Sequence, residues 1–224
     1  MLVSIIVPVY NEAATVGEVL ERLPALPFEK EILVVNDGSS DGTREALAPF
    51  EKRAGYKVHH SPVNLGKGSS VRIGIGMATG EIITIQDADL ELDPFEVPRL
   101  IEPVASGKFD VVYGSRFLDG GRKGAWAFYL ANRSLSGLTN LLYGSRLTDI
   151  ETCYKVLRRD VLERLTLRGS RFEIEPELTA QLLKAGVHIE EMPISYNPRS
   201  RAQGKKISWR DGVAAVATLV SQRL

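Results

Sequence analysis

Four carboxylates lie within seven residues of one another near the middle of the chain, at Asp87, Asp89, Glu91 and Asp93. They follow residues 82–85, a β-branched run typical of a central strand that is covered on both faces. Like charges this close repel one another, and Mg²⁺ or Mn²⁺ would neutralise them and carry substrate phosphates. A solvated acidic loop is the alternative, because Asp-x-Asp is a common pattern. The position at the carboxyl end of a buried strand favours the metal site.

The sequence around these acids alternates between short apolar runs and helical patterns. Strands are predicted at 2–7, 32–35, 57–60, 82–85 and 110–113, with helices at 15–23, 44–53, 69–78 and 94–106. Thr15 and Glu18 have the spacing of a capping box at the start of the first helix. This order predicts an α/β fold built from βαβ units, with a mainly parallel central sheet flanked by helices.

The second half departs from this alternation. The expected elements are a long, weakly charged helix at 125–143, strands at 154–157 and 189–196, a helix at 175–185 and an amphipathic helix at 208–224. Pro193 interrupts the last strand and places it at an edge of the sheet. The aromatic residues that begin the 125–143 helix are explained either by core packing or by an apolar surface near lipid headgroups.

Length and composition indicate a single domain, since 224 residues with 44% hydrophobic content can bury one large core. Basic and acidic residues number 28 each, so no net charge attracts the molecule to nucleic acid. Cys153 is the only cysteine, which fits a reducing cytoplasm. The chain has no signal-peptide pattern and no run near the roughly 20 apolar residues of a membrane span. We therefore expect a cytoplasmic protein, either soluble or peripheral at the membrane.

The predicted strands bring several polar segments to one place, because the carboxyl ends of parallel strands meet at the same edge of a sheet. These segments are residues 8–12, 36–43 and 87–91, together with Arg116. The acids could bind a metal ion, and the other polar groups could bind a base and a ribose. This combination is typical of a nucleotide-binding site. Asp37 could accept a hydrogen bond from the base or ribose, and Tyr10 could pack on a ring. The alternative for residues 36–42 is a tight turn with Asp41 as a helix cap.

Two basic segments offer side chains to phosphate groups. Gly66-Lys67-Gly68 permits close backbone approach, but it lacks the P-loop pattern and equally fits a helix-entry turn with a surface lysine. Residues 199–210 carry five cationic side chains and no acid. They form either a solvated basic loop or a phosphate clamp. The candidate clamp residues are Arg199, Arg201, Lys205 and Lys206.

Together and in order, these motifs resemble family 2 glycosyltransferases of the GT-A fold, whose central sheet is Rossmann-like. The segments that carry the resemblance are PVYNE at 8–12, NDGSSDGT at 36–43, NLGKG at 64–68, DAD at 87–89, GSR at 114–116, TD at 148–149 and CYK at 153–155. Within the family the sequence is most similar to dolichyl- or polyprenyl-phosphate mannose and glucose synthases, from Pro8 to about Trp209. It departs from them at Glu91, where glutamine is usual, and at Cys153-Tyr154, where Gly-Phe is usual.

The resemblance implies an inverting enzyme that moves mannose or glucose from GDP-mannose or UDP-glucose to a polyprenyl or dolichyl phosphate. Asp87 and Asp89 would contact the metal and the donor diphosphate, and Glu91 would be the third metal position. The rest of the nucleotide-sugar pocket would be formed by Pro8, Tyr10, Glu12, Asp37, Lys67, Arg199 and Lys205. Residues 1–116 would form the nucleotide-sugar half of the domain, and residues 117–224 the acceptor half.

The acceptor determines the expected mechanism. A lipid monophosphate is already anionic, so its oxygen could attack the anomeric carbon without a general base while the metal stabilises the departing diphosphate. The expected catalytic residues are Asp89, Arg116 and Arg133. The two arginines would hold the acceptor phosphate. Ser136 on the same helix face and Arg201 from the basic loop would assist them. Outside such a site, an arginine at position 133 would be an ordinary surface residue.

Several alternatives share the same metal and nucleotide edge. A hydroxyl acceptor in cell-wall, polysaccharide or glycolipid synthesis would need a base, for which Asp149, Glu151 and Glu175 are candidates. A sugar nucleotidyltransferase or a non-catalytic sugar-nucleotide-binding subunit would use the edge differently. The chain has no Gln-x-x-Arg-Trp sequence, which argues against a processive polysaccharide synthase.

Overall fold

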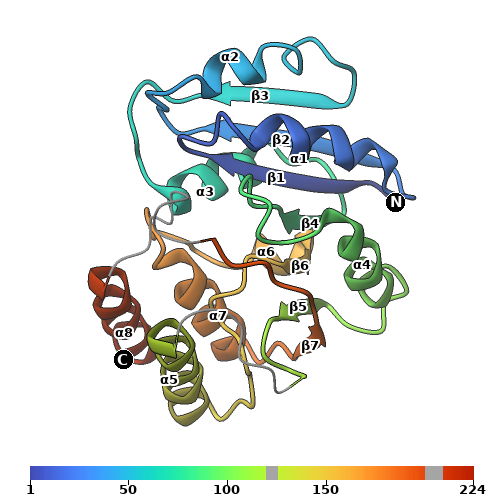
Figure 1. Cartoon of the computed structure of the whole chain (residues 1–224). Coiled ribbons are helices and arrows are strands. Elements are labelled where there is room, and N and C mark those ends of the chain that lie inside the picture. The colour runs from blue at the N-terminus through green and yellow to red at the C-terminus, as the bar shows by residue number, and fades with distance from the viewer. Residues whose placement is uncertain (120–125, 200–208) are drawn as a thin grey trace.

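The computed structural model describes residues 1–119, 126–199 and 209–224, and it contains one seven-stranded sheet in the order β3-β2-β1-β4-β6-β5-β7 (Figure 1). The strands are β1 Val3–Val9, β2 Lys30–Asn36, β3 Tyr56–His60, β4 Ile82–Ile85, β5 Val111–Ser115, β6 Lys155–Arg158 and β7 Ile189–Pro193. Strand β6 is antiparallel to β4 and to β5, and the other pairings are parallel. The α/β class, the mainly parallel sheet and the edge position of β7 are therefore confirmed.

The helices lie close to the predicted positions, except α6 Arg159–Leu162, which was not predicted. They are α1 Val16–Arg22, α2 Thr43–Leu47, α3 Lys67–Met77, α4 Val97–Ala105, α5 Trp126–Tyr143, α6 Arg159–Leu162, α7 Ile174–Lys184 and α8 Trp209–Arg223, with 3₁₀ turns η1 Leu23–Ala25 and η2 Pro94–Glu96. The predicted 44–53 helix is wrong beyond Leu47, because Pro49 has no amide hydrogen to continue the helix. The predicted capping box is also wrong. The Thr15 hydroxyl donates instead to the carbonyl of Ala88, at 2.7 Å.

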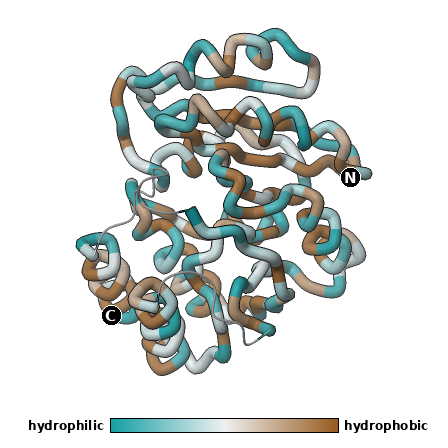
Figure 2. The backbone as a smooth tube through the Cα atoms, in the orientation of Figure 1, coloured by the Kyte–Doolittle hydropathy of each residue, from teal (hydrophilic) through white to brown (hydrophobic). Residues whose placement is uncertain are grey.

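Apolar side chains cover both faces of the sheet. Val3, Ile5 and Val7 of β1 pack in one cluster with residues of α1 and α4, whereas Ile6 packs in a second cluster with residues of α7 and α8. Figure 2 shows hydrophobic colour concentrated on the strands, and mixed colours along the helices. The period of two along β1 thus gives each face of the sheet its own core.

Helices α5, α7 and α8 pack together beside the lower half of the sheet (Figure 1). The hydroxyl of Tyr143 at the end of α5 donates to the carbonyl of Leu219 in α8, at 2.7 Å. Outward-facing apolar side chains remain on both helices, among them Trp126 (60% exposed), Leu141 (82%) and Trp209 (74%). Within the three described ranges, each helix is too short or too polar to cross a bilayer.

Candidate functional site

A cavity of about 590 Å³ opens at the carboxyl edge of the sheet, where the segments after β1, β2, β4 and β5 meet. Its lining includes ten of the residues singled out from the sequence: Pro8, Tyr10, Glu12, Asp37, Lys67, Asp87, Asp89, Glu91, Arg116 and Arg199. The second half of the chain adds Glu151, Cys153, Glu173, Glu175, Tyr196, Arg210 and Asp211. Carboxylates and cations from segments far apart in the sequence are therefore brought into one enclosure.

Lys67, at the start of α3, pairs with carboxylates on the floor of the cavity. Its Nζ atom lies 2.9 Å from Oδ1 of Asp87 and 3.3 Å from Oε1 of Glu175. Burial disfavours the ionised form of Asp87, but the charge of Lys67 outweighs it and holds the pKa of Asp87 below its ordinary value. In this arrangement Lys67 neutralises the first aspartate of the Asp-x-Asp motif.

Arg199 bridges the acids that follow β1 and β4. Its guanidinium lies 2.8 Å from Oε2 of Glu12 and 2.8 Å from Oδ2 of Asp89, and its backbone amide donates to Oε1 of Glu91 at 2.8 Å. Burial and then repulsion from Asp87 raise the pKa of Asp89 to about 7, although Arg199 opposes the shift. Asp89 therefore binds a proton more readily than an ordinary carboxyl, in spite of its ion pair with Arg199.

These contacts show whether the residues present fit the divalent metal ion expected from the sequence. Across residues 1–119, 126–199 and 209–224, no three His, Cys, Asp or Glu side chains converge closely enough to enclose an ion. Arg199 instead places its positive charge beside Asp89 and Glu91. The donor set at Asp87 and Asp89 nevertheless consists of the carboxylate oxygens that Mg²⁺ and Mn²⁺ prefer. Together with the raised pKa of Asp89, this chemistry fits a divalent ion.

Asp37 lies in the cavity wall and holds the loop that leads into α3. Its two carboxylate oxygens accept hydrogen bonds from the amides of Leu65 and Gly66, each at 2.8 Å. Gly66 has φ of +96°, in the region that favours glycine. At Gly68, an added Cβ would lie 2.6 Å from the carbonyl oxygen of Gly169. The close backbone approach predicted for this glycine-rich segment is thus made to another loop of the chain.

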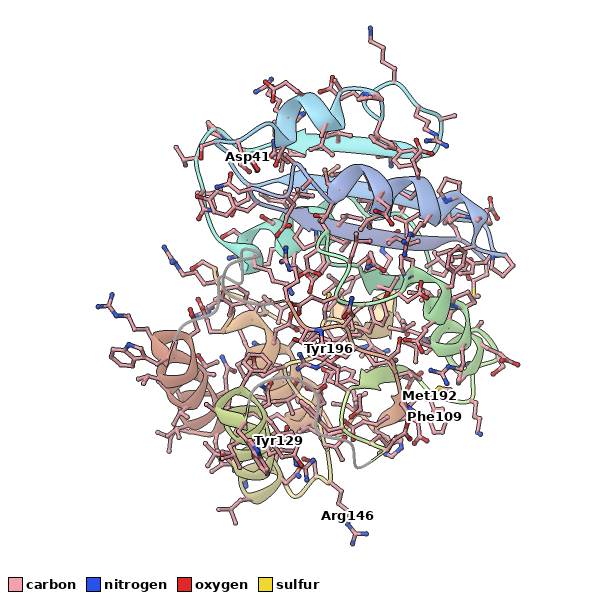
Figure 3. All side chains as sticks on the ribbon, in the orientation of Figure 1. Asp41, Phe109, Tyr129, Arg146, Met192 and Tyr196 are labelled. Atoms are coloured by element: carbon pink, nitrogen blue, oxygen red, sulfur yellow. The ribbon has the colours of Figure 1, made fainter. Side chains whose placement is uncertain are left out.

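The tight turn predicted at residues 36–42 is also present, although the N-cap residue of α2 is Gly42 and not Asp41. Oδ1 of Asp41 accepts a hydrogen bond from the amide of Thr43 at 2.9 Å, at the start of α2. Figure 3 shows Asp41 beside the upper strands of the sheet. Asp37 and Asp41 therefore stabilise two different backbone turns.

Arg116, which follows β5, is fixed by Asp149. Its Nε and Nη2 atoms lie 2.7 Å from the two carboxylate oxygens, and its backbone amide donates to the same group at 3.0 Å. Asp149 is 0% exposed, and the guanidinium also packs over the ring of Tyr196, 5.2 Å from its centroid. Tyr196 lies near the middle of the molecule in Figure 3. The sequence contained no sign of the Arg116–Asp149 pairing, because 33 residues separate the two.

Two other predicted residues, Arg133 and Ser136, do not line the cavity. The exposed side chain of Arg133 donates to the carbonyl of Thr148 at 3.2 Å. Ser136 is 1% exposed and accepts from the amide of Ile150 at 3.3 Å. Both side chains contact residues 148–150, as expected for one helix face, but Ser136 is buried and Arg133 is exposed. Three further predicted residues lie outside the described part of the chain: Arg201, Lys205 and Lys206.

A buried ion pair between Lys155 and Glu175 adjoins the cavity, which Glu175 also lines. Lys155 is 0% exposed, forms an ion pair with Glu175 and donates to the carbonyl of Ile150 at 3.0 Å. Glu151 lines the cavity close to this pair. Burial and then repulsion from Glu175 raise the pKa of Glu151 to about 7. Sequence reasoning named Glu151 and Glu175 only as bases for a hydroxyl acceptor, and it gave no role to Lys155.

Comparisons with known proteins identify relatives of the whole described fold. A family model described as glycosyl transferase family 2 matches residues 4–166. The chain is 32% identical to a dolichol-phosphate mannosyltransferase of Pyrococcus furiosus over 92% of this chain and 59% of that one. It is 30% identical to an undecaprenyl-phosphate 4-deoxy-4-formamido-L-arabinose transferase of Edwardsiella ictaluri, over 91% and 62% of the two chains. The chain thus spans about three-fifths of the length of these two relatives.

A solved structure of similar fold is glucosyl-3-phosphoglycerate synthase from Mycobacterium tuberculosis, in complex with Mn²⁺, uridine diphosphate and glucosyl-3-phosphoglycerate. The alignment has a TM-score of 0.77 and 20% sequence identity, and it covers 99% of this chain and 79% of that chain. This similarity supports the predicted fold class.

Proposed function

The chain belongs to glycosyl transferase family 2, and we propose that it transfers a hexose, mannose or glucose, from a nucleotide-diphosphate sugar to a polyprenyl phosphate with inversion. The observation that carries this proposal is the cavity at the carboxyl edge of the sheet, where buried carboxylates and cations surround space for a charged ligand. Support for the acceptor comes from the two relatives named above, which are a dolichol-phosphate and an undecaprenyl-phosphate transferase.

Donor binding is assigned to the β1, β2 and β4 side of the cavity. Asp87 and Asp89, with Glu91 beside them, would hold Mg²⁺ or Mn²⁺, and the ion would stabilise the charge of the departing diphosphate. Glu12 and Asp89 hold the guanidinium of Arg199 at the same place, where its positive charge would attract the diphosphate. Pro8, Tyr10 and Asp37 would form the wall for the nucleoside, and Lys67 and Lys205 would add positive charge.

Acceptor binding is assigned to Arg116. Asp149 fixes the guanidinium in one orientation, which lowers the conformational entropy lost when a phosphate binds. The phosphate monoester is an anion at neutral pH, so its oxygen can attack the sugar without losing a proton to the protein. Arg201 retains the supporting role that the sequence assigns to it. Arg133 and Ser136 do not enter the proposal, because their side chains are bound elsewhere.

Transfer from labelled GDP-mannose and UDP-glucose, with and without polyprenyl phosphate and Mn²⁺, tests this function. We expect a lipid-linked product from one donor only when both the lipid and the metal are present. Asp89→Ala should reduce transfer by at least about 100-fold, because the diphosphate loses most of its electrostatic stabilisation. Glu163→Gln, which changes an exposed carboxylate paired with Arg159, is the control and should leave transfer unchanged. Full activity of Asp89→Ala would refute the metal assignment.

The same assay separates the alternative functions. A hydroxyl-acceptor enzyme would form product with an alcohol acceptor and not with the lipid phosphate. A sugar nucleotidyltransferase would release or incorporate pyrophosphate, and a non-catalytic subunit would bind the donor without turnover. The lipid-linked product is the outcome that the anion-binding arginine Arg116 favours.

We further propose that the apolar side chains left exposed on α5 and α8 make peripheral contact with the cytoplasmic membrane face. A phosphate on a polyprenyl chain lies at the headgroup level, where aromatic side chains such as Trp126 and Trp209 are well accommodated. Sedimentation with anionic liposomes should fall when both tryptophans are changed to serine. Phe95→Ser, which changes an exposed apolar residue on η2, is the control. Equal sedimentation of all three proteins would contradict the contact.

A further inference from the structure

Glu151 has a buried carboxylate oxygen to which no group in the described part of the chain donates. This atom, Oε1, has no hydrogen-bond partner, and the residue lines the cavity. Of the neighbouring acids, Asp149 accepts from Arg116 with both oxygens, and Glu175 accepts from Lys155 with Oε2. Oε1 of Glu175 has no hydrogen-bond partner within the described residues either, but it lies 3.3 Å from the positive charge of Lys67 Nζ. A buried acceptor that lacks a donor is rare in folded proteins and costs free energy unless a ligand supplies the donor.

The surroundings of Glu151 restrict what that donor can be. Glu175 repels negative charge at this position, whereas Lys155 and Arg116 attract it, and burial disfavours any net charge. A fully ionised phosphate brings acceptors only and cannot satisfy a carboxylate oxygen. A neutral hydroxyl group can satisfy it, because it donates a hydrogen bond without adding charge.

In a nucleotide-diphosphate sugar, the hydroxyl groups belong to the ribose and to the transferred hexose. The proposed nucleoside wall at Tyr10 and Asp37 follows β1 and β2. Glu151 precedes β6, which is hydrogen-bonded on the far side of β4 from β1. It also follows, by two residues, Asp149, which holds the guanidinium of Arg116, the proposed acceptor-phosphate residue. The hexose must reach toward the acceptor, so its hydroxyls are the ones that come to Glu151.

We propose that the Glu151 carboxyl receives a hydrogen bond from one hydroxyl group of the transferred hexose and thereby selects the sugar. This inference rests on the proposed function and adds the residue that reads the sugar. It makes Glu151 a specificity-determining residue with no proton transfer of its own. A site that hydrogen-bonds a substrate hydroxyl discriminates strongly against the deoxy analogue, because the buried oxygen is then left without a donor.

The test uses the donor that the wild-type protein turns over, GDP-mannose or UDP-glucose, and the four analogues of that donor lacking the hydroxyl at position 2, 3, 4 or 6 of the hexose. We expect one analogue to lose about 10- to 100-fold in kcat/KM with the wild-type protein. Glu151→Met keeps the volume of the side chain and removes its polar oxygens. With this variant, kcat/KM for the same analogue should be less than about threefold lower than kcat/KM for the complete sugar. Glu163→Gln is the matched control and should behave as the wild type.

Titration calorimetry supplies a readout that does not depend on turnover. Glu151→Met should weaken binding of the nucleotide sugar and leave binding of GDP or UDP within about twofold of the wild type. Glu151→Gln, with the same shape and a hydrogen-bonding side chain, is the second variant if Glu151→Met does not fold. It should alter the analogue preference at the same single position.

The outcomes separate this inference from the function it rests on. If the wild type transfers sugar but all four analogues lose the same factor with and without Glu151, the role of Glu151 is wrong and the transfer activity stands. If Glu151→Met weakens binding of the nucleoside diphosphate as much as binding of the nucleotide sugar, the role of Glu151 is also wrong. No transfer from either donor by the wild-type protein would overturn both the proposed function and this inference.

Discussion

The ion pair between Arg116 and Asp149 should contribute strongly to folding as well as to the site. Asp149 is 0% exposed and Arg116 is 8% exposed, and two charged hydrogen bonds of 2.7 Å join them. Asp149→Leu keeps a side chain of similar size but leaves the guanidinium buried without a counter-charge. Removing one partner of such a pair typically costs about 3–5 kcal/mol.

This loss of free energy corresponds to a change in the melting temperature, Tm. For a domain of 150–250 residues, 1 kcal/mol corresponds to about 2–4 °C, so we expect Asp149→Leu to lower Tm by about 6–20 °C. The control is Glu21→Gln, which breaks the exposed pair with Arg53, whose side chain is 38% exposed. Exposed pairs contribute about 0–1 kcal/mol, so its Tm should change by less than about 4 °C.

A double-mutant cycle decides whether the pair itself is responsible. The assay is urea unfolding of the wild type, Arg116→Met, Asp149→Leu and the double variant, all at pH 7. Because the double variant contains no buried unpaired charge, we expect it to be more stable than Asp149→Leu alone. A loss below about 1 kcal/mol for Asp149→Leu, or strict additivity of the two single changes, would refute this reasoning.

Three further predictions concern stability, each measured by urea or thermal unfolding. Burial and Glu175 raise the pKa of Glu151 from 4.5 to about 7, so the folded state loses stability as pH rises through that range. Glu151→Gln should therefore match the wild type near pH 4 and be more stable at pH 8, by at most about 3 kcal/mol; equal stability at both pH values would contradict the shift. Lys155→Met should lower the free energy of unfolding by about 3–5 kcal/mol, because the buried charge of Glu175 then loses its main counter-charge. An unchanged free energy of unfolding would show that Lys67 alone is a sufficient partner for Glu175. Gly68→Ala should destabilise because its Cβ would lie 2.6 Å from a backbone oxygen, whereas Gly76→Ala, with open space around it, should stabilise the helix by about 0.5–1 kcal/mol.

The order of elements could be predicted from the sequence because it depends on local patterns. The apolar runs at β1, β2 and β4 are buried strands, and the polar segments after them lie at one edge, as the parallel arrangement requires. Local signals also explain the failures. Pro49 ended α2 earlier than the hydrophobic spacing suggested, and Thr15 used its hydroxyl for a contact 73 residues away in place of a cap.

The residues of the candidate site could be predicted from the sequence, but the ion pairs that they form could not. Asp87, Asp89, Glu91 and Arg116 were identified by type and position, and all four line the cavity. Their partners were not predictable. Arg199 reaches Asp89 across 110 residues of sequence, and no periodicity or spacing reports such a contact.

By itself, the sequence determined that strands alternate with helices and that acids follow a buried strand, because side-chain period and turn chemistry act over a few residues. Only the tertiary structure decided which cation neutralises which acid, Lys67 for Asp87 and Arg199 for Asp89. It also decided that no group of the described residues donates a hydrogen bond to Oε1 of Glu151. The physical reason is that the strength of a charge interaction depends on distance and burial in the folded chain. Those quantities are set when the sheet brings distant segments to one edge.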